Sequence, residues 1–477
     1  MKIRKAIKSD SAKDFSNLFF SHILQKFFGF IREPVTSFFF GVTSPFIAYQ
    51  ILRTAANLFS QFTVGNALKA NLLPKFTKIY EEHTSVSLIK VFSFSKKSMK
   101  LLFFISQLIQ SVIIIYIYMY TDINKMVDEV QLFFPGFSIS VEHIIISLFI
   151  ISIILSISIC FNFFNMLYLI IIQAKGEFFK YSIATTLNSF IVVLFIIPLS
   201  YFFHIIGLVI SRLLGIVSLT ISYILPMNKK TDGYEVELTK KDINIPILVL
   251  GNFANIIIVS SQLVAGTGGS ETITYFYYAV FILNAVLTSV IGNVSTILLR
   301  KISIGRNDKW IYLSLGVSVM IGLLMCICFY LFSYEIVYFI YMGANNLISL
   351  GLDFISWFLG FFNVSSDLDI KGKFGIEQVK HTSRYLYQLS YSFIFIFIAT
   401  ILFQPFFSLS NKKTKKARND MSLIFLFVVF GGIFILSLLS IDVKIKSLVL
   451  IYVSSFVSVI LSIYSYYYYL RNHVEKE

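Results

Sequence analysis

The chain has 477 residues, of which 57% are hydrophobic and only 14% are charged, and its formal net charge is +15. Soluble domains carry about 25% charged residues, so this composition argues against a soluble protein and indicates a polytopic membrane protein. Most basic residues lie in short loops between apolar runs, which favours a membrane protein over the nucleic-acid binding that such a charge could otherwise suggest.

Twelve stretches are apolar over about 20 residues, the length that a membrane-spanning helix needs. In chain order the predicted spans are 14–40, 44–68, 101–120, 144–172, 178–202, 205–227, 244–265, 273–299, 310–334, 385–407, 421–440 and 446–470. A further apolar piece, 345–363, could be an interfacial helix, a re-entrant segment or a thirteenth span.

Charges in the loops orient these spans. The loops around Lys75 to Lys100, Lys175 and Lys180, 229–241, 300–309 and 412–418 are basic, whereas 122–142 and 266–272 are acidic or nearly uncharged. Basic loops remain on the cytoplasmic side, so we expect a multi-pass protein of a bacterial cytoplasmic (inner) membrane with both termini cytoplasmic. This alternation holds to the C-terminus if 345–363 does not cross.

The most polar internal loop falls near the middle of the chain. It predicts an N-terminal six-helix lobe at 1–228, a cytoplasmic linker at 229–242 and a C-terminal six-helix lobe at 243–477, which includes the segment 345–363. Two lobes of six helices suggest a transporter built around a central cavity. We therefore expect an all-α polytopic membrane protein, large enough to be stable as a monomer.

Charged and amide side chains interrupt the apolar pattern of the first two spans. Lys26, Arg32 and Glu33 lie in the first, and Arg53 and Asn57 lie in the second. Each charge would cost about 2.5–3.5 kcal/mol at the centre of a membrane helix. Internal pairing and helix–helix contacts could account for them, but the cations outnumber Glu33, which favours an anionic ligand or a hydrated cavity.

The second half repeats this pattern with neutral groups. Asn252 and Asn255 lie on the seventh span and Asn284 on the eighth, at helical spacing with other polar residues. These amides could form interhelical hydrogen bonds or line a cavity. Arg212, on the sixth span, could extend to the membrane interface or line the cavity.

Sequence motifs for other chemistry are missing. Cys160, Cys326 and Cys328 lie in apolar runs and are interpreted as small buried side chains, without metal-ligand or disulfide spacing. The run GTGGS at 266–270 is a short turn between spans and not a phosphate-binding loop. We therefore expect neither a metal nor a cofactor, and no catalytic residue is assigned.

Several short runs resemble the MurJ (MviN) lipid II flippases of the multidrug, oligosaccharidyl-lipid and polysaccharide exporter superfamily. The first half supplies Gly29-Phe30-Ile31-Arg32-Glu33, Phe40-Gly41, Ala48-Tyr49, Asn57-Leu58 and Pro74 in the order of that family. The second half is similar over SSQLVAGTGGSETITYFYYAVFILNAVLTSVIGNVSTILL, with Tyr277-Tyr278-Ala279, and over KGKFGIEQV at 371–379.

The resemblance implies a flippase with two lobes that open alternately around a cationic cavity. Arg32 matches a first-helix arginine of the family, and Lys26 stands where a second basic residue is usual. The sequence departs from the family at Ser60 and Ile47, where the family carries charge, and it keeps Arg53 as an additional cation. These departures fit a relative that moves a polyprenyl-linked glycan other than lipid II.

We therefore expect a flippase for a polyprenyl-diphosphate-linked saccharide, either lipid II or a polysaccharide repeat unit, with membrane lipids as further partners. The candidate binding residues are Lys26, Arg32, Glu33, Arg53, Asn57, Asn252, Asn255 and Asn284. One alternative is an integral membrane enzyme of polysaccharide assembly, such as a polymerase or ligase. Another is an ion-coupled drug exporter of the same superfamily, and a third is a scaffold of cell-wall assembly that transports nothing.

Overall fold

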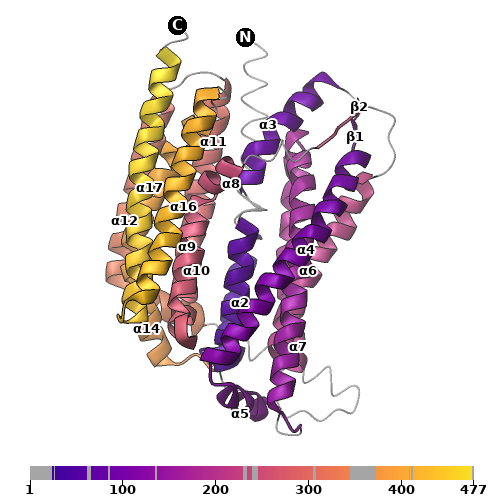
Figure 1. The fold of residues 1–477 in the computed structure, drawn as a ribbon, viewed down its shortest axis with the longest axis vertical. Coiled ribbons are helices and arrows are strands. Elements are labelled where there is room, and N and C mark those ends of the chain that lie inside the picture. Colours follow the sequence, from indigo (N-terminus) through magenta and orange to yellow (C-terminus); the bar gives the residue numbers. More distant parts are fainter. Residues whose placement is uncertain are drawn as a thin grey trace. The chain divides into compact units, whose positions relative to one another are not determined.

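The computed structural model describes residues 24–25, 27–61, 66–83, 86–134, 137–228, 234–238, 245–304, 308–343, 372–407, 409 and 412–474. Lys26, the segment 345–363 and most of the linker 229–242 lie outside these residues. The described chain is almost entirely helical (Figure 1), and its one sheet is the parallel pair β1–β2.

Residues 27–40 are helical, and a turn at Gly41 leads to the labelled elements. In chain order these are α2 (Ser44–Gln61), α3 (Asn66–Glu82), β1 (Val86–Ser87), α4 (Ile89–Tyr120), α5 (Ile123–Phe133), α6 (Val141–Ala174), α7 (Phe178–Leu219), η1 (Thr220–Ile224), η2 (Leu225–Asn228), β2 (Tyr234–Glu235), α8 (Ile245–Gly251), α9 (Phe253–Ala265), η4 (Thr267–Gly269), α10 (Thr272–Val286), η5 (Leu287–Ile291), α11 (Gly292–Ile304), α12 (Asp308–Tyr341), α14 (Ile376–Leu402), α15 (Gln404–Phe407), α16 (Lys412–Leu438) and α17 (Val443–Val474). Most helices extend past the predicted apolar cores, because polar end residues continue the helix into the loops.

The chain divides into two compact units. The first contains 1–56, 72–242 and 338–376, and the second contains 57–71, 243–337 and 377–477. These units are not simple halves of the sequence, since each includes a short piece from the other half. The predicted lobe boundaries at 228 and 243 stay a prediction.

Eight helices of the described chain are long and apolar enough to cross a membrane, and the pair α8–α9, bent by 72°, makes a ninth. One of the eight, α7, is a hairpin. Its backbone leaves helical geometry at His204 (φ 52°, ψ −132°), and a Cβ on Gly207 would collide with the carbonyl of Leu199. Eight residues of straight helix would separate those atoms by about 12 Å, so the chain reverses at His204.

This reversal confirms the predicted spans 178–202 and 205–227 and brings the number of candidate spans among the described residues to ten. The all-α polytopic membrane fold is thereby confirmed. As far as the structure describes them, helix 27–40 and α2 do not pass the same test, and these segments carry Arg32, Glu33 and Arg53.

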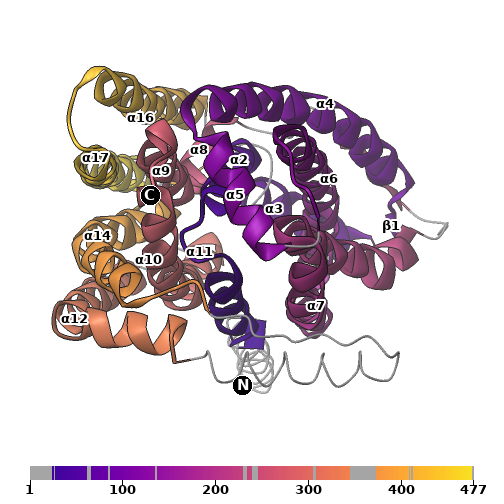
Figure 2. The same ribbon diagram turned by 90° about the horizontal axis from the view of Figure 1, so that it is seen from below.

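The first unit is built on α4, α6 and the α7 hairpin, which pack side by side (Figure 1). One face of α4 enters the core through Val91, Leu102, Gln110 and Ile117, spaced as one helical stripe. The short helix α5 lies across one end of these helices (Figure 2), and the β1–β2 pair lies at the opposite end.

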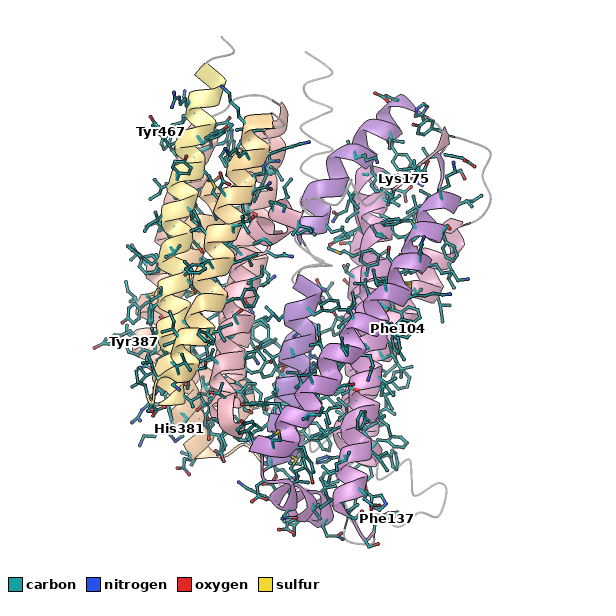
Figure 3. The ribbon with its side chains drawn as sticks, in the orientation of Figure 1. Phe104, Phe137, Lys175, His381, Tyr387 and Tyr467 are labelled. Carbon is teal, nitrogen blue, oxygen red and sulfur yellow. The ribbon has the colours of Figure 1, made fainter. Side chains whose placement is uncertain are left out.

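Contacts fix both ends of the first unit. At the strand end, the rings of His83 and Tyr234 stack with centroids 4.0 Å apart, and Lys175 lies over the Tyr80 ring. At the α5 end, Glu129 accepts hydrogen bonds from the backbone and hydroxyl of Ser44. Within the first unit, the described parts of the basic loops and of the acidic loop 122–142 therefore lie at opposite ends. Figure 3 marks this separation with Lys175 and Phe137.

The second unit is a helical bundle in which α9 packs on α17, α16 and α10. At one end the ring of His381 stacks on Tyr275, and Lys444 lies over the Tyr385 ring. Figure 3 places His381 at this end and Tyr467 toward the other. Of the three cysteines, Cys160 and Cys326 are buried as expected, but Cys328 is exposed on α12, so the prediction for Cys328 was wrong.

Candidate functional site

Arg32 and Glu33 form an ion pair in helix 27–40. The Nε and Nη2 groups of Arg32 both donate to Oε1 of Glu33, at 2.9 and 2.6 Å. The Glu33 side chain is 0% exposed, whereas 27% of the Arg32 side chain remains exposed. A buried carboxylate requires such a partner. The pairing predicted as one explanation for these charges is therefore present, and Arg32 still reaches the surface of the unit.

A second cation, Arg212 of the α7 hairpin, contacts α2. Nη1 of Arg212 donates to the hydroxyl of Tyr49 at 2.8 Å, and the guanidinium lies 5.9 Å from the Tyr49 ring centre. Nε and Nη2 of Arg212 are buried without a hydrogen-bond partner among the described residues. Arg212 therefore contacts α2 within this unit, and its two predicted locations, the membrane interface or a cavity lining, stay predictions.

Arg53 lies one helical turn after Tyr49 on α2, so both side chains project from the same side of this helix. Arg53 is half-buried. The neighbouring Gln50 is fully buried, and neither its amide nitrogen nor its amide oxygen has a hydrogen-bond partner among the described residues. From α4, the Gln110 amide donates to the carbonyl of Leu52 at 3.1 Å.

The first unit thus collects Arg53, Arg212, Gln50 and Gln110 on and around α2. Sequence analysis assigned only Arg53 of these four. The glutamines were missed because one amide in an apolar helix resembles ordinary helix–helix contact. Buried polar groups without partners are rare in folded proteins, and this rarity, visible only in the structure, marks Gln50 and Arg212.

The predicted asparagines lie in the second unit. Asn57 is half-buried, and its carbonyl accepts the Ser60 hydroxyl at 2.8 Å. Asn252 is buried at the break between α8 and α9, and Asn255 is half-buried one turn later. Asn284 is half-buried with its side-chain oxygen unpartnered among the described residues. It lies three residues before the π-helical turn η5, an irregularity that is frequent at functional sites.

The structure therefore brings together Arg32 with Glu33, and Arg212 with α2, inside the first unit. The asparagines belong to the second unit, and Lys26 lies outside the described residues. Among the residues that the structure describes, no group of three His, Cys, Asp or Glu side chains could hold a metal ion. The guanidinium and amide groups of these arginines and asparagines can donate hydrogen bonds, and such donors are suited to phosphate and sugar oxygens.

Neither a protein-family model nor a curated protein sequence matches the chain. Solved structures do. The lipid II flippase MurJ in an inward closed conformation matches with a TM-score of 0.58 and 19% identity, over 95% of this chain and 86% of that one. An inward-facing multidrug resistance MATE family transporter of the MOP superfamily matches with a TM-score of 0.54 and 11% identity, over 94% of both chains.

A further MATE structure, a complex with MaD3S, matches with a TM-score of 0.52 and 13% identity, over 98% of this chain and 97% of that one. Identities this low establish the fold alone. They confirm the fold that the sequence resemblance predicted. The chain has the fold of the lipid II flippase MurJ and of the MATE transporters of the MOP superfamily.

Proposed function

We propose that this protein is a flippase that moves a polyprenyl-diphosphate-linked saccharide across the cytoplasmic membrane by alternating access of its two helical units. The observation that carries the proposal is the buried, partly unsatisfied guanidinium of Arg212 beside α2. Apart from its bond to Tyr49, this guanidinium keeps two buried donors without partners among the described residues. Buried donors are costly to leave unsatisfied, so their retention favours an anionic ligand.

The balance of charge supports the same conclusion. Helix 27–40, α2 and the part of α7 after its first turn carry three cations but one anion. The cations are Arg32, Arg53 and Arg212, and the anion is Glu33. A diphosphate supplies several acceptor oxygens that arginine can bind with two parallel hydrogen bonds. The amides of Asn252, Asn255 and Asn284 are suited to sugar hydroxyls from the second unit, and Lys26 is a further candidate from sequence.

The energetics permit transport without ATP. We place the basic, strand-bearing end of the first unit in the cytoplasm and both termini on that side. Moving an anion outward from a negative-inside cell releases about 2.3 kcal/mol per charge for each 100 mV. The membrane potential could therefore bias the direction, and a single chain suffices for the cycle.

A drug exporter is the rival class, because the MATE transporters share the fold. Such an exporter needs carboxylates for cationic cargo. Glu33 is the acidic residue of helix 27–40 and α2, and its Oε1 already accepts two hydrogen bonds from Arg32. This arrangement favours anionic cargo.

The test uses the full chain in proteoliposomes with a fluorescent polyprenyl-diphosphate saccharide in the membrane. Arg32→Ala should abolish flipping while insertion and abundance stay unchanged. Arg384→Ala, at an exposed arginine of α14, is the matched control and should flip at the wild-type rate. Normal flipping by Arg32→Ala would remove Arg32 from the site.

The substrate is identified by complementation of two depleted strains, one lacking lipid II flipping and the other lacking flipping of a polysaccharide repeat unit. We expect rescue of the second strain, because Ser60 and Ile47 replace charges of the lipid II flippases. Rescue of the first strain alone would assign lipid II. Export of cationic dyes without any saccharide flipping would overturn the proposal in favour of the drug exporter.

A further inference from the structure

One helix in each unit begins with exposed lysines and continues as an exposed apolar stripe. On α4 the lysines are Lys96, Lys97 and Lys100, and the stripe below them runs through Leu101, Phe104, Leu108, Ile115 and Met119. Phe104 is 72% exposed and Leu108 is 69% exposed. Residues spaced by three, four and seven positions share one helical face, so Lys97 stands directly above this stripe.

The second unit carries the same arrangement on α16. Lys413, Lys415 and Lys416 are exposed, and below them an exposed stripe runs through Leu423, Phe427, Phe434 and Leu438. The two helices are unrelated in sequence, and α4 and α16 belong to different units. The repetition therefore reflects the same kind of environment for both helices, a lipid-facing surface with a charged edge.

The stripes have the dimensions of a bilayer. Lys97 and Met119 are 22 positions apart, and so are Lys416 and Leu438. At about 1.5 Å per residue this is about 33 Å, against about 30 Å for the hydrocarbon core. The apolar stripe thus fits the acyl chains, and the lysines are held at the level of the phosphate groups.

These lysines are available to a ligand. Lys90, at the start of α4, is already paired with Glu235 at 2.9 Å, but no ion pair involves Lys96, Lys97 or Lys100 among the described residues. No acidic residue occurs between Ile89 and Tyr120. On α16, Asp420 lies one turn below Lys416 on the same stripe. The positive potential is therefore stronger at α4.

We propose that the lysine-headed faces of α4 and α16 bind the phosphate headgroups of anionic glycerophospholipids, with α4 the stronger of the two. Clusters of lysines at the edge of a membrane helix attract anionic lipids. The acyl chains of a bound lipid lie on the exposed stripe while its phosphate meets the lysines. This binding is independent of the saccharide proposed as cargo.

The test places a single tryptophan beside each cluster and asks which lipid quenches it. Trp310 and Trp357 are first replaced by Phe, and then Leu101→Trp reports on α4 or Leu423→Trp on α16. The full chain is reconstituted in phosphatidylcholine vesicles that contain either brominated phosphatidylglycerol or brominated phosphatidylcholine at equal mole fraction. Helix α12 is the control. Its one basic residue is Lys309, which follows Asp308, and Leu313→Trp reports on it.

We expect brominated phosphatidylglycerol to quench the α4 probe most, the α16 probe less and the α12 probe no more than brominated phosphatidylcholine does. Replacing Lys96, Lys97 and Lys100 with Gln should lower the preference at α4 by up to about five-fold per lysine at low salt. Replacement with Arg should preserve it, and 1 M salt should reduce it.

Two outcomes overturn the proposal: equal quenching of the α4 probe by the two lipids, or an unchanged preference after the three Gln substitutions. Unfolding cannot imitate the expected result, because the α12 probe in the same Gln variant must keep its wild-type quenching. Flipping is not the readout, so failure here leaves the proposed cargo untouched.

Discussion

Each unit holds an arginine against a neighbouring helix or turn, buried for Arg418 and half-buried for Arg212, and the two guanidinium groups have different partners. Arg418 in the second unit is 4% exposed. Its Nη2 donates to the carbonyl of Phe406 at 2.9 Å and also to that of Leu409, and its guanidinium lies over the Phe406 ring. Its Nε is buried without a partner among the described residues. Arg212 in the first unit has one bond, to Tyr49, and two buried groups without partners among the described residues.

The difference supports a structural role for Arg418 and the ligand-binding role proposed for Arg212. The last carbonyls of a helix have no partner within that helix, and Arg418 satisfies those of Phe406, at the end of α15, and of Leu409, just after it. Arg212 satisfies no backbone group of the described chain. In the proposed site an anion would supply the missing partners of Arg212, whereas Arg418 holds two chain segments together.

The largest expected effect is that of Arg418→Met. It would leave buried carbonyls unsatisfied, and hydrogen bonds to a charged group contribute about 1.5–3 kcal/mol each. We expect the free energy of unfolding to fall by about 3 kcal/mol, seen as a lower melting temperature in detergent and reduced abundance. Arg418→Lys should recover part of this loss. Wild-type stability of Arg418→Met would show that Arg418 is not structural.

Arg212→Met should have the opposite profile. Removing donors that have no partners should leave the melting temperature unchanged or slightly higher. Loss of a buried cation–phosphate contact of about 2 kcal/mol should weaken binding of the polyprenyl-diphosphate saccharide roughly 30-fold. A titration of binding together with a melting curve checks both. A fall in stability like that of Arg418→Met would erase the contrast between the two arginines.

Tyr49→Phe should give the smallest effect. It removes only the hydroxyl that accepts from Arg212 and leaves the ring and its burial in place. We expect stability to change by about 1 kcal/mol and binding to weaken by a few-fold, because the guanidinium loses its position but not its charge. Tyr168→Phe, at a buried hydroxyl of α6 without a partner among the described residues, is the matched control and should bind normally.

Patterns along the sequence predicted much of the fold because lipid imposes them. Every span must be apolar for about 20 residues and must satisfy its own backbone. The break at His204 was readable as a gap between two such stretches, and the reversal there confirms it. The 72° bend between α8 and α9 was not predicted, because a short apolar helix pair reads as one continuous span.

For the candidate site, the sequence identified charged residues within predicted membrane spans, namely Arg32, Glu33 and Arg53. It could not say which would pair, since that depends on side-chain geometry within a single turn. Arg212 and Arg418 illustrate the same limit. Arg212 lies within a predicted span and Arg418 in a predicted basic loop, and only the structure shows which partners each of them has.

The sequence by itself determined the membrane class, the order of most spans and the excess of cations in the first helices, because hydrophobicity and charge are local properties. The tertiary structure decided which cations are satisfied: Arg32 by Glu33, Arg418 by backbone carbonyls, and Arg212 by one tyrosine hydroxyl. Glu33 is the neighbour of Arg32 in the same helix, but the partners of Arg212 and Arg418 come from a helix distant in the chain and from a turn whose geometry depends on packing, and neither follows from periodicity.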